Sequence, residues 1–281
     1  MTALRSLFER RLLVHAVVAV GLALLCQVAP AQSPKPQRIV SLNPCIDAVL
    51  VEVADASQIL ALSHYSHDPA ATAMAMERAA PFAVTYGSAE EVIMLQPDLV
   101  LTSTMTSSAT LRALRDYGVA VQTLPVPQSL VAEREQIRAV AEAAGHEDRG
   151  VALIAQIDHA VALAHTKQPP VPALVRQLDG LVPGDGTLVD ELLQAAGFAN
   201  TSADYGLAQW DMLPLELLAA NPPQVMLTDV PAGQLARLHP AYARITRQTA
   251  VRVLPSRYLR CGGPTLVPAL EHLADIRRHL P

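Results

Sequence analysis

The sequence lacks the features that mark several common protein classes. Three cysteines among 281 residues are too few for a disulfide framework, although they allow one bridge in an oxidising compartment. The formal net charge of −5 is not the positive excess of a protein that binds nucleic acid. The catalytic motifs GxSxG, GxxxxGKS/T and HExxH do not occur. We therefore expect neither nucleic-acid binding nor enzymatic activity; a hydrolase would lack an identifiable nucleophile.

The first 31 residues have the composition of a secretory signal peptide. Arg5, Arg10 and Arg11 precede the apolar run Leu12–Cys26, and residues 29–31 (Ala-Pro-Ala) fit a cleavage site for small residues. The run is shorter than the roughly 20 residues that a membrane-spanning helix needs. We predict export with cleavage after residue 31. An uncleaved membrane anchor is the alternative, and the route, general or twin-arginine, stays open.

Removal of this leader leaves 250 residues with a net charge of −7, because the leader carries three arginines and Glu9. Such a charge favours a soluble monomer and argues against an anionic membrane surface as a partner. Two cysteines remain, Cys45 and Cys261. They could form a bridge, bind a ligand or be small buried residues, and the last is the simplest interpretation.

One pattern occurs twice in the same order. The first copy runs from Glu90 to Ser103 and continues from Gly118 to Pro125; the second runs from Leu215 to Asp229 and continues from Thr249 to Pro255. Each copy predicts a helix stopped by proline, a strand that ends at a polar residue, and a β-branched strand that ends at Leu-Pro. The helix-stopping prolines are 125 residues apart and the strand-ending prolines 130. A solenoid unit would recur at roughly 20 to 50 residues, so we predict two similar α/β lobes.

Strands alternate with helices in both halves of the chain, which predicts parallel sheets. A polar segment with two prolines, residues 32–37, is expected to be disordered, and the N-terminal lobe covers residues 38–127. A helical region follows at residues 128–168; its second run, residues 147–166, would be roughly 30 Å long. The C-terminal lobe covers residues 169–281. The predicted fold class is α/β, with two Rossmann-like lobes joined by a single long α-helix and a ligand cleft between them.

Within the N-terminal lobe the pattern predicts both elements and helix caps. The strands, including one extended segment, are expected at residues 38–42, 59–63, 81–87, 99–103 and 119–124, the helices at residues 45–54, 70–80 and 110–118, and a loop at residues 64–69. Ser88 and Glu91 form a capping box for a further helix, which Pro97 terminates.

Ligands of open parallel sheets bind beyond the carboxyl ends of the strands, so the residues after each predicted strand are candidate contacts. They are Asn43, Cys45, His64, Tyr65, His67, Tyr86, Tyr205, Trp210, Arg257, Tyr258 and Arg260. Five of the nine aromatic residues after residue 31 belong to this set. Tyrosine and tryptophan suit a large, flat, partly apolar ligand. The alternative for each ring is that it packs under its own loop and contacts no ligand. The two arginines either clamp an anionic group or lie in solvated loops.

Three residues of one loop offer an alternative function. His64, His67 and Asp68 supply imidazole and carboxylate groups, which are ordinary ligands of zinc and similar ions. A closed site needs three or four protein ligands, and no second histidine cluster faces this one in the pattern. Direct binding of zinc or manganese is therefore the alternative, and no resident cofactor is expected.

Several motifs together resemble a known family. They are RIVSLNP at residues 38–44, GSAEEVIMLQPDLVLTS at residues 87–103, LVDELLQAAGFAN at residues 188–200 and CGGP at residues 261–264, with the long mid-chain helix between them. This set resembles the periplasmic substrate-binding proteins for ferric siderophores, haem and cobalamin, over nearly the whole chain after the leader. The resemblance implies a periplasmic protein that holds a metal chelate between two lobes. It also implies delivery to the permease of an ATP-driven (ABC) importer in the inner membrane.

The sequence departs from the family that it resembles at the positions expected to dock to the permease. That family presents a glutamate on each lobe to permease arginines. At the first position this sequence has Ala48 with Asp47 beside it, and at the second it has Gln194 with Glu191 one turn earlier. We expect either that these neighbouring residues substitute or that docking differs. The negative charge still favours electrostatic docking, and the stiff connecting helix predicts limited closure of the cleft.

Overall fold

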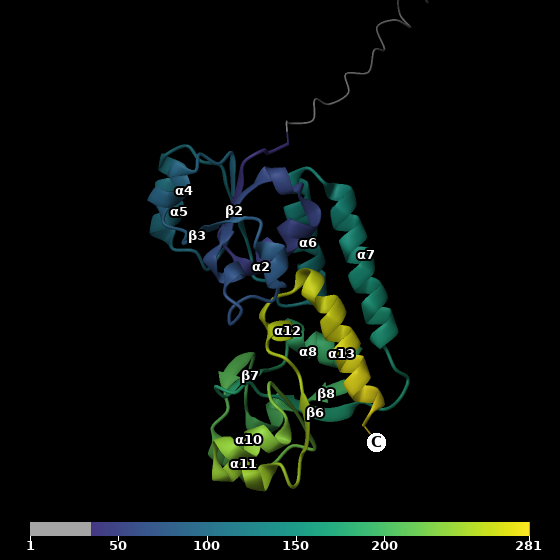
Figure 1. Ribbon diagram of the computed structural model, residues 1–281. Helices are drawn as coiled ribbons and strands as arrows, with labels where there is room; N and C mark the ends of the chain where they lie inside the picture. Colours follow the sequence, from purple (N-terminus) through teal and green to yellow (C-terminus); the bar gives the residue numbers. More distant parts are fainter. Residues whose placement is uncertain (1–34, 281) are drawn as a thin grey trace, which may run out of the picture. The chain divides into compact units, whose positions relative to one another are not determined.

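The computed structural model describes residues 35–280, which belong to one compact unit beginning at Lys35. The predicted signal peptide, residues 1–31, lies outside the described residues. Among the helices of residues 35–280, none has the length and apolar character that crossing a membrane requires. Two parallel sheets, each with its own short helices, and a group of long helices form the main parts of this unit (Figure 1).

The N-terminal lobe is built on five parallel strands in the order β3-β2-β1-β4-β5. They are β1 (Ile39–Ser41), β2 (Ile59–Ser63), β3 (Ala83–Thr85), β4 (Leu99–Ser103) and β5 (Val121–Leu124). The central strands β1 and β4 are buried along their whole length. Parallel strands need crossover connections that place helices on the sheet faces, so such strands are apolar throughout.

The helices of this lobe begin where short polar side chains cap them. Helix α2 (Pro44–Val53) has Asn43 as its N-cap, which accepts hydrogen bonds from two backbone N–H groups of the first turn, and Pro44 fits the first helical position. The other helices are α3 (Met76–Ala79), α4 (Ala89–Met94) and α5 (Ser108–Asp116). Ser88 and Ser107 cap α4 and α5 in the same way. Local sequence therefore sets these boundaries.

The C-terminal lobe repeats the plan with four parallel strands in the order β11-β10-β6-β8. They are β6 (Val171–Val175), β8 (Phe198–Asn200), β10 (Val225–Thr228) and β11 (Ala250–Val253), and a separate antiparallel pair is formed by β7 (Leu181–Pro183) and β9 (Trp210–Met212). Strand β10 lies between β6 and β11 just as β4 lies between β1 and β5. The prediction of two similar α/β lobes is confirmed.

Five short helices complete the C-terminal lobe. They are α8 (Leu188–Ala195), α9 (Leu215–Ala220), α10 (Ala232–Leu238), α11 (Pro240–Ile245) and α12 (Arg257–Arg260).

Long helices run beside both lobes (Figure 1). Helix α6 (Leu130–Ala144) ends at Gly145 in the left-handed conformation that glycine adopts readily, and α7 (Glu147–Ala164) follows. Helices α6 and α7 approach closely at Gly150, where a Cβ atom would press on the side chain of Ala141. Helix α13 (Leu266–Arg278), the last of the described chain, packs along α7. The linking helix was predicted at residues 147–166 and ends two residues earlier.

Four local predictions differ from the structure. Residues 64–67 form a 3-10 helix, η2 (His64–His67), and the helix predicted at residues 70–80 is reduced to the four residues of α3. In the predicted capping box the carboxylate of Glu91 accepts from the backbone N–H of Tyr86 (2.9 Å), not from that of Ser88. Of the segment predicted to be disordered, residues 32–34 lie outside the described residues, whereas residues 35–37 are held in place: the side-chain amide of Gln58 donates to the Pro36 carbonyl (2.6 Å).

Candidate ligand-binding site

The carboxyl ends of the N-terminal strands face residues of the C-terminal lobe across a cavity of about 250 Å³. Its walls are mainly apolar, with a few polar side chains. From the N-terminal lobe and α6 it is lined by Asn43, Cys45, Ser103, Pro125, Val126, Pro127, Gln128, Glu133 and Gln136, and from the C-terminal lobe by Leu188, Val189, Leu192, Trp210, Tyr258, Leu259, Arg260, Cys261, Gly262 and Leu266. Binding sites for small molecules have this character of apolar walls with few polar groups.

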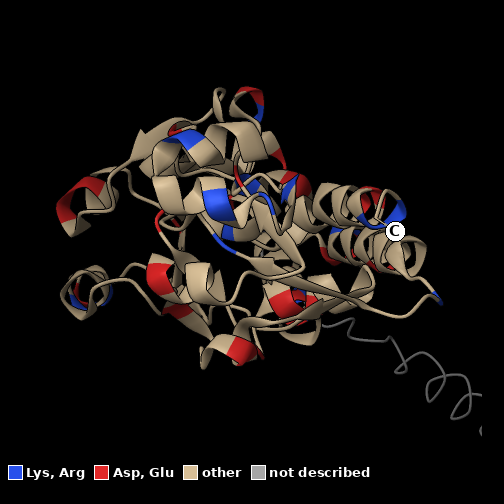
Figure 2. Cartoon of the chain, turned by 90° about the horizontal axis from the view of Figure 1, so that it is seen from below, with Lys and Arg blue, Asp and Glu red and all other residues tan. Residues whose placement is uncertain are grey.

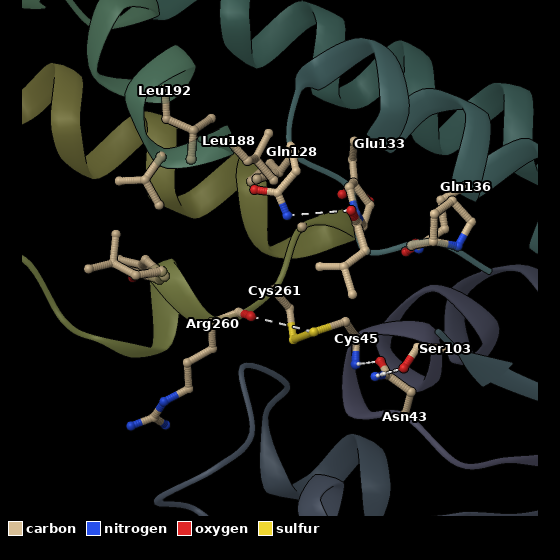
Figure 3. A pocket seen from close by; sticks show the side chains of 18 of the residues that line it. Asn43, Cys45, Ser103, Gln128, Glu133, Gln136, Leu188, Leu192, Arg260 and Cys261 are labelled. Carbon is tan, nitrogen blue, oxygen red and sulfur yellow. Dashed lines mark hydrogen bonds between the residues drawn. A yellow bond between two sulfur atoms is a disulfide. The ribbon is translucent and has the colours of Figure 1, made fainter. Parts of the chain in front are cut away.

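A disulfide bond between Cys45 and Cys261 forms part of this cavity wall (Figure 3). Cys45 lies in the first turn of α2, and Cys261 follows α12 in the C-terminal lobe; their Cα atoms are 5.0 Å apart. The interpretation of these cysteines as two small buried residues was wrong. The bond adds a covalent connection between the two lobes at the base of the cavity.

Glu133 of α6 is a buried carboxyl group beside this disulfide, with 1% of its surface exposed. Its Oε1 accepts a hydrogen bond from the backbone N–H of Gly263 (2.7 Å), whereas its Oε2 has no partner. A Cβ atom at Gly262 would collide with the carboxylate, so a larger residue there would displace the side chain of Glu133. Burial raises the pKa of Glu133 from 4.5 to about 7, which the bond from Gly263 opposes.

A second hollow of about 370 Å³ adjoins the first on the N-terminal lobe and shares Asn43 and Ser103 with it. Three predicted contacts, His64, Tyr65 and Tyr86, line it. The ring centroid of His64 lies 3.9 Å from that of Tyr65 and 4.9 Å from that of Tyr86. Tyr86 is 75% exposed. We name His64, Tyr65 and Tyr86 the aromatic wall.

The predicted contacts thus fall into three groups. Asn43, Cys45, Trp210, Tyr258 and Arg260 line the interlobe cavity, and the aromatic wall lines the adjoining hollow. In Figure 3 the side chain of Arg260 extends away from Glu133 and Gln128; it donates to the Thr72 carbonyl (3.3 Å). The remaining contacts, His67, Tyr205 and Arg257, lie elsewhere.

Tyr205 and Arg257 have local roles instead. The Tyr205 hydroxyl donates to the Asn221 carbonyl (2.6 Å), and burial, followed by the charge of Asp204, raises its pKa to about 12. Tyr205 therefore seals a loop base. The guanidinium of Arg257 lies over its neighbour's ring, 5.0 Å from the centroid of Tyr258. His67 has a buried Nε2 without a hydrogen-bond partner and lines neither hollow.

The alternative of direct metal binding finds no site in the described part of the chain. Residues 35–280 contain no group of three or more His, Cys, Asp or Glu side chains that could hold a metal ion. The ring of His64 packs against Tyr65 and Tyr86 in the aromatic wall. It does not form a metal-ligand group with His67 and Asp68.

The expected docking residues are mostly engaged within the molecule. Asp47 is 0% exposed, so it cannot meet a permease, and this expectation was wrong. Burial raises its pKa from 3.8 to about 7. Glu191 accepts a hydrogen bond from the Leu130 N–H (2.6 Å) at the start of α6, and Gln194 donates to Asp190 (2.9 Å). Of the three expected positions, Gln194 is the exposed one.

Sequence reasoning missed several cavity residues that lie outside the strand ends. Glu133 and Gln136 belong to α6, and Leu188 and Leu192 belong to α8. Glu133 and Gln136 gave no signal in the sequence, because an acidic residue soon after a serine cap is typical of the first turn of any helix. The two consecutive glycines at 262 and 263 were the available signal, because such a pair indicates the close approach of another group.

The fold is that of a two-lobed α/β binding protein with its cleft between the lobes. A model of the family described as periplasmic binding protein matches residues 39–250. The chain therefore belongs to the periplasmic binding protein family, whose members are binding proteins rather than enzymes.

Comparisons with individual proteins agree with this assignment. A cobalamin-binding protein of Halobacterium salinarum is 26% identical over an alignment of 257 residues, and the match covers 86% of this chain and 69% of that protein. YvrC of Bacillus subtilis, an uncharacterised ABC transporter substrate-binding lipoprotein, is 27% identical over 66% of this chain and 63% of its own. Among solved structures, the apo form of the periplasmic heme-binding protein RhuT from Roseiflexus sp. RS-1 is 28% identical, with a TM-score of 0.67; the match covers 86% of this chain and 99% of that one.

Proposed function

We propose that this protein is the substrate-binding component of an ABC importer and captures a metal chelate, a corrinoid, haem or ferric siderophore, outside the cytoplasmic membrane. The observation that carries the proposal is a pair of adjoining hollows: one lies between the lobes, and the other lies on the N-terminal lobe and is lined by the aromatic wall. A relative in sequence is named for binding cobalamin, and a solved structure of the same fold is named for binding haem. YvrC is named as an ABC transporter component.

The chemistry of the hollows suits a metal that arrives inside an organic ligand. Rings with exposed faces stack on flat, partly apolar molecules and leave their polar edges for hydrogen bonds. The hollows of about 250 and 370 Å³ together fall in the range of small-molecule sites. Residues 35–280 contain no cluster of metal ligands, so the chelate itself would hold the ion.

A fluorescence titration tests this function directly. Trp210 is the sole tryptophan of the chain and lines the interlobe cavity. Haemin, cyanocobalamin and a ferric hydroxamate are each titrated into the purified protein. We expect at least one of them to quench the emission of Trp210 with saturation. If none of the three changes the emission or co-elutes with the protein, the proposed function is wrong.

The aromatic wall is tested by truncation of its rings. Tyr65→Ala and Tyr86→Ala should each weaken binding of the chelate about fivefold, because a stacking contact contributes about 1 kcal/mol. Tyr117→Ala is the matched control, since Tyr117 is 74% exposed and lies in neither hollow. Equal affinity of all three variants would contradict a role for the wall.

Docking to the permease is proposed to use acids that the internal repeat places alike on the two lobes. Glu90 and Glu91 lie in the first turn of α4, and Glu216 lies in the first turn of α9, the corresponding helix of the second copy. Glu90 and Glu216 are exposed, whereas Glu91 accepts from the Tyr86 N–H. In the view of Figure 2, acidic and basic residues are interspersed. We therefore assign docking to matched single residues and not to an extended surface of one charge.

Charge reversal tests this assignment. Glu90→Lys combined with Glu216→Lys should slow association with the reconstituted importer about tenfold, because rim charges act mainly on the association rate. Affinity for the chelate should not change. Glu147→Lys, in the first turn of α7, is the control. An unchanged association rate of the double variant would refute this assignment.

A further inference from the structure

Asp47 is a buried carboxyl group that holds the turn carrying part of the aromatic wall. Its Oδ2 accepts one hydrogen bond from the backbone N–H of Ser63 (2.9 Å) and a second from the hydroxyl of Ser66 (2.6 Å). Both serines are buried, as is Asp47 itself. One carboxyl group on α2 therefore fixes the residues on either side of His64 and Tyr65.

The geometry of this turn determines where the two rings lie. The hydroxyl of Ser63 accepts from the backbone N–H of Tyr65 (3.4 Å), so the residue that Asp47 holds also orients the first residues of η2. The ring of His64 then contacts both Tyr65 and Tyr86. A change in the direction of this short helix would move two of the three rings of the wall.

Packing alone gives no reason for an aspartate at this position. The neighbouring residues of α2, Ile46, Ala48, Val49 and Leu50, belong to the buried core, where an aliphatic side chain would avoid the cost of burying a carboxyl group. Its second oxygen, Oδ1, has no hydrogen-bond partner. Burial of the Asp47 carboxyl group therefore costs free energy, and its two hydrogen bonds to the turn offset only part of that cost. A buried polar group that is only partly satisfied calls for an explanation, and a role in function is one.

The same helix also carries the connection to the other lobe. Cys45, two residues before Asp47, forms the disulfide to Cys261 at the base of the interlobe cavity. Helix α2 thus contacts both the turn that carries His64 and Tyr65 and, through the disulfide, the part of the cavity wall that the C-terminal lobe contributes. We propose that Asp47 is a positioning residue for ligand capture, which orients His64 and Tyr65 toward the cleft through Ser63 and Ser66.

This inference rests on the proposed function, and the variants separate positioning from stability. Asp47→Asn keeps an oxygen that accepts from Ser63 and Ser66, whereas Asp47→Leu removes the acceptor and keeps a buried side chain. Ser66→Ala removes one bond and perturbs the fold least. Ser108→Ala, at an exposed position of α5, is its control. The probes are haemin and cyanocobalamin.

We expect Asp47→Leu to weaken binding of the probe that the wild type binds at least tenfold, and Ser66→Ala to weaken it about threefold. Asp47→Asn should stay within about twofold of the wild type, because a neutral acceptor retains both bonds. If Asp47→Leu does not fold, the comparison of Ser66→Ala with Ser108→Ala decides. Equal affinities in that pair would overturn the proposal.

A measurement on the ligand-free protein distinguishes failure of this inference from failure of the proposed function. Hydrogen exchange at the Ser63 amide and the ring resonances of Tyr65 need no chelate. We expect faster exchange and shifted resonances in Asp47→Leu, and wild-type behaviour in Asp47→Asn. If neither probe binds the wild type, the proposed function fails while these signals still decide the role of Asp47. Unchanged exchange and resonances in Asp47→Leu would overturn it.

Discussion

Replacement of both Cys45 and Cys261 by serine is expected to lower the free energy of unfolding by about 4 kcal/mol. The two cysteines are 216 residues apart in the sequence, so the bond closes a very long loop. A cross-link restricts the unfolded chain more as its loop lengthens, although measured gains are often smaller than this model gives. The bond also joins the two lobes, so its loss removes their covalent connection at the cavity base.

Urea denaturation of the oxidised protein, the reduced protein and the double serine variant tests this expectation. The reduced wild type and the variant should have the same lowered midpoint, and a reductant should not affect the variant. Chelate affinity should also fall, since both cysteines line the cavity. A midpoint that neither reduction nor substitution moves would contradict the prediction.

A rise in pH from 5 to 8 should also destabilise the protein, by about 2 kcal/mol for each of two buried carboxyl groups. Burial raises the pKa of Asp47 from 3.8 to about 7 and that of Glu133 from 4.5 to about 7. Between about pH 4 and pH 7 the folded state therefore binds more protons than the unfolded state. Stability falls with rising pH across this window and levels off above the folded-state pKa values.

Two neutral variants isolate this effect from other titrating groups. Asp47→Asn and Glu133→Gln should each be more stable than the wild type at pH 8 and should each remove about half of the decrease. Asp55→Asn is the control, because the bond from Arg149 lowers the pKa of Asp55, the opposite direction. Urea denaturation at pH 5, 6, 7 and 8 measures all four proteins. A wild type that is as stable at pH 8 as at pH 5, with no gain in either variant, would refute the assignment.

Local sequence signals predicted most of the secondary structure. Ser88 before α4 and Asn43 before α2 are caps whose side chains bond to the first turn, so the beginnings of these helices are encoded within a few residues. The prediction failed for residues 70–80, where an alanine-rich pattern gave a helix of four residues. Intrinsic helix propensity contributes little to the free energy of folding compared with tertiary packing, so packing can override it in this segment.

The composition of the site followed less completely from the sequence. The rule that ligands meet strand ends selected Asn43 and the aromatic wall, which line adjoining hollows. The same rule selected Tyr205, whose hydroxyl is used within its own loop. It missed Glu133, because α6 reaches the cavity from a distant part of the chain. Whether these residues bind a ligand remains a prediction.

The sequence by itself determined the repeated lobes, their parallel sheets and the beginnings of their helices, because apolar periodicity and capping act over short stretches of chain. The tertiary structure alone decided that Cys45 and Cys261 form a bond, that Asp47 holds a turn instead of facing a partner, and that Glu133 is buried against two glycines. Each of these facts depends on which distant segments meet. That depends on how the lobes pack together, and no short stretch of sequence contains it.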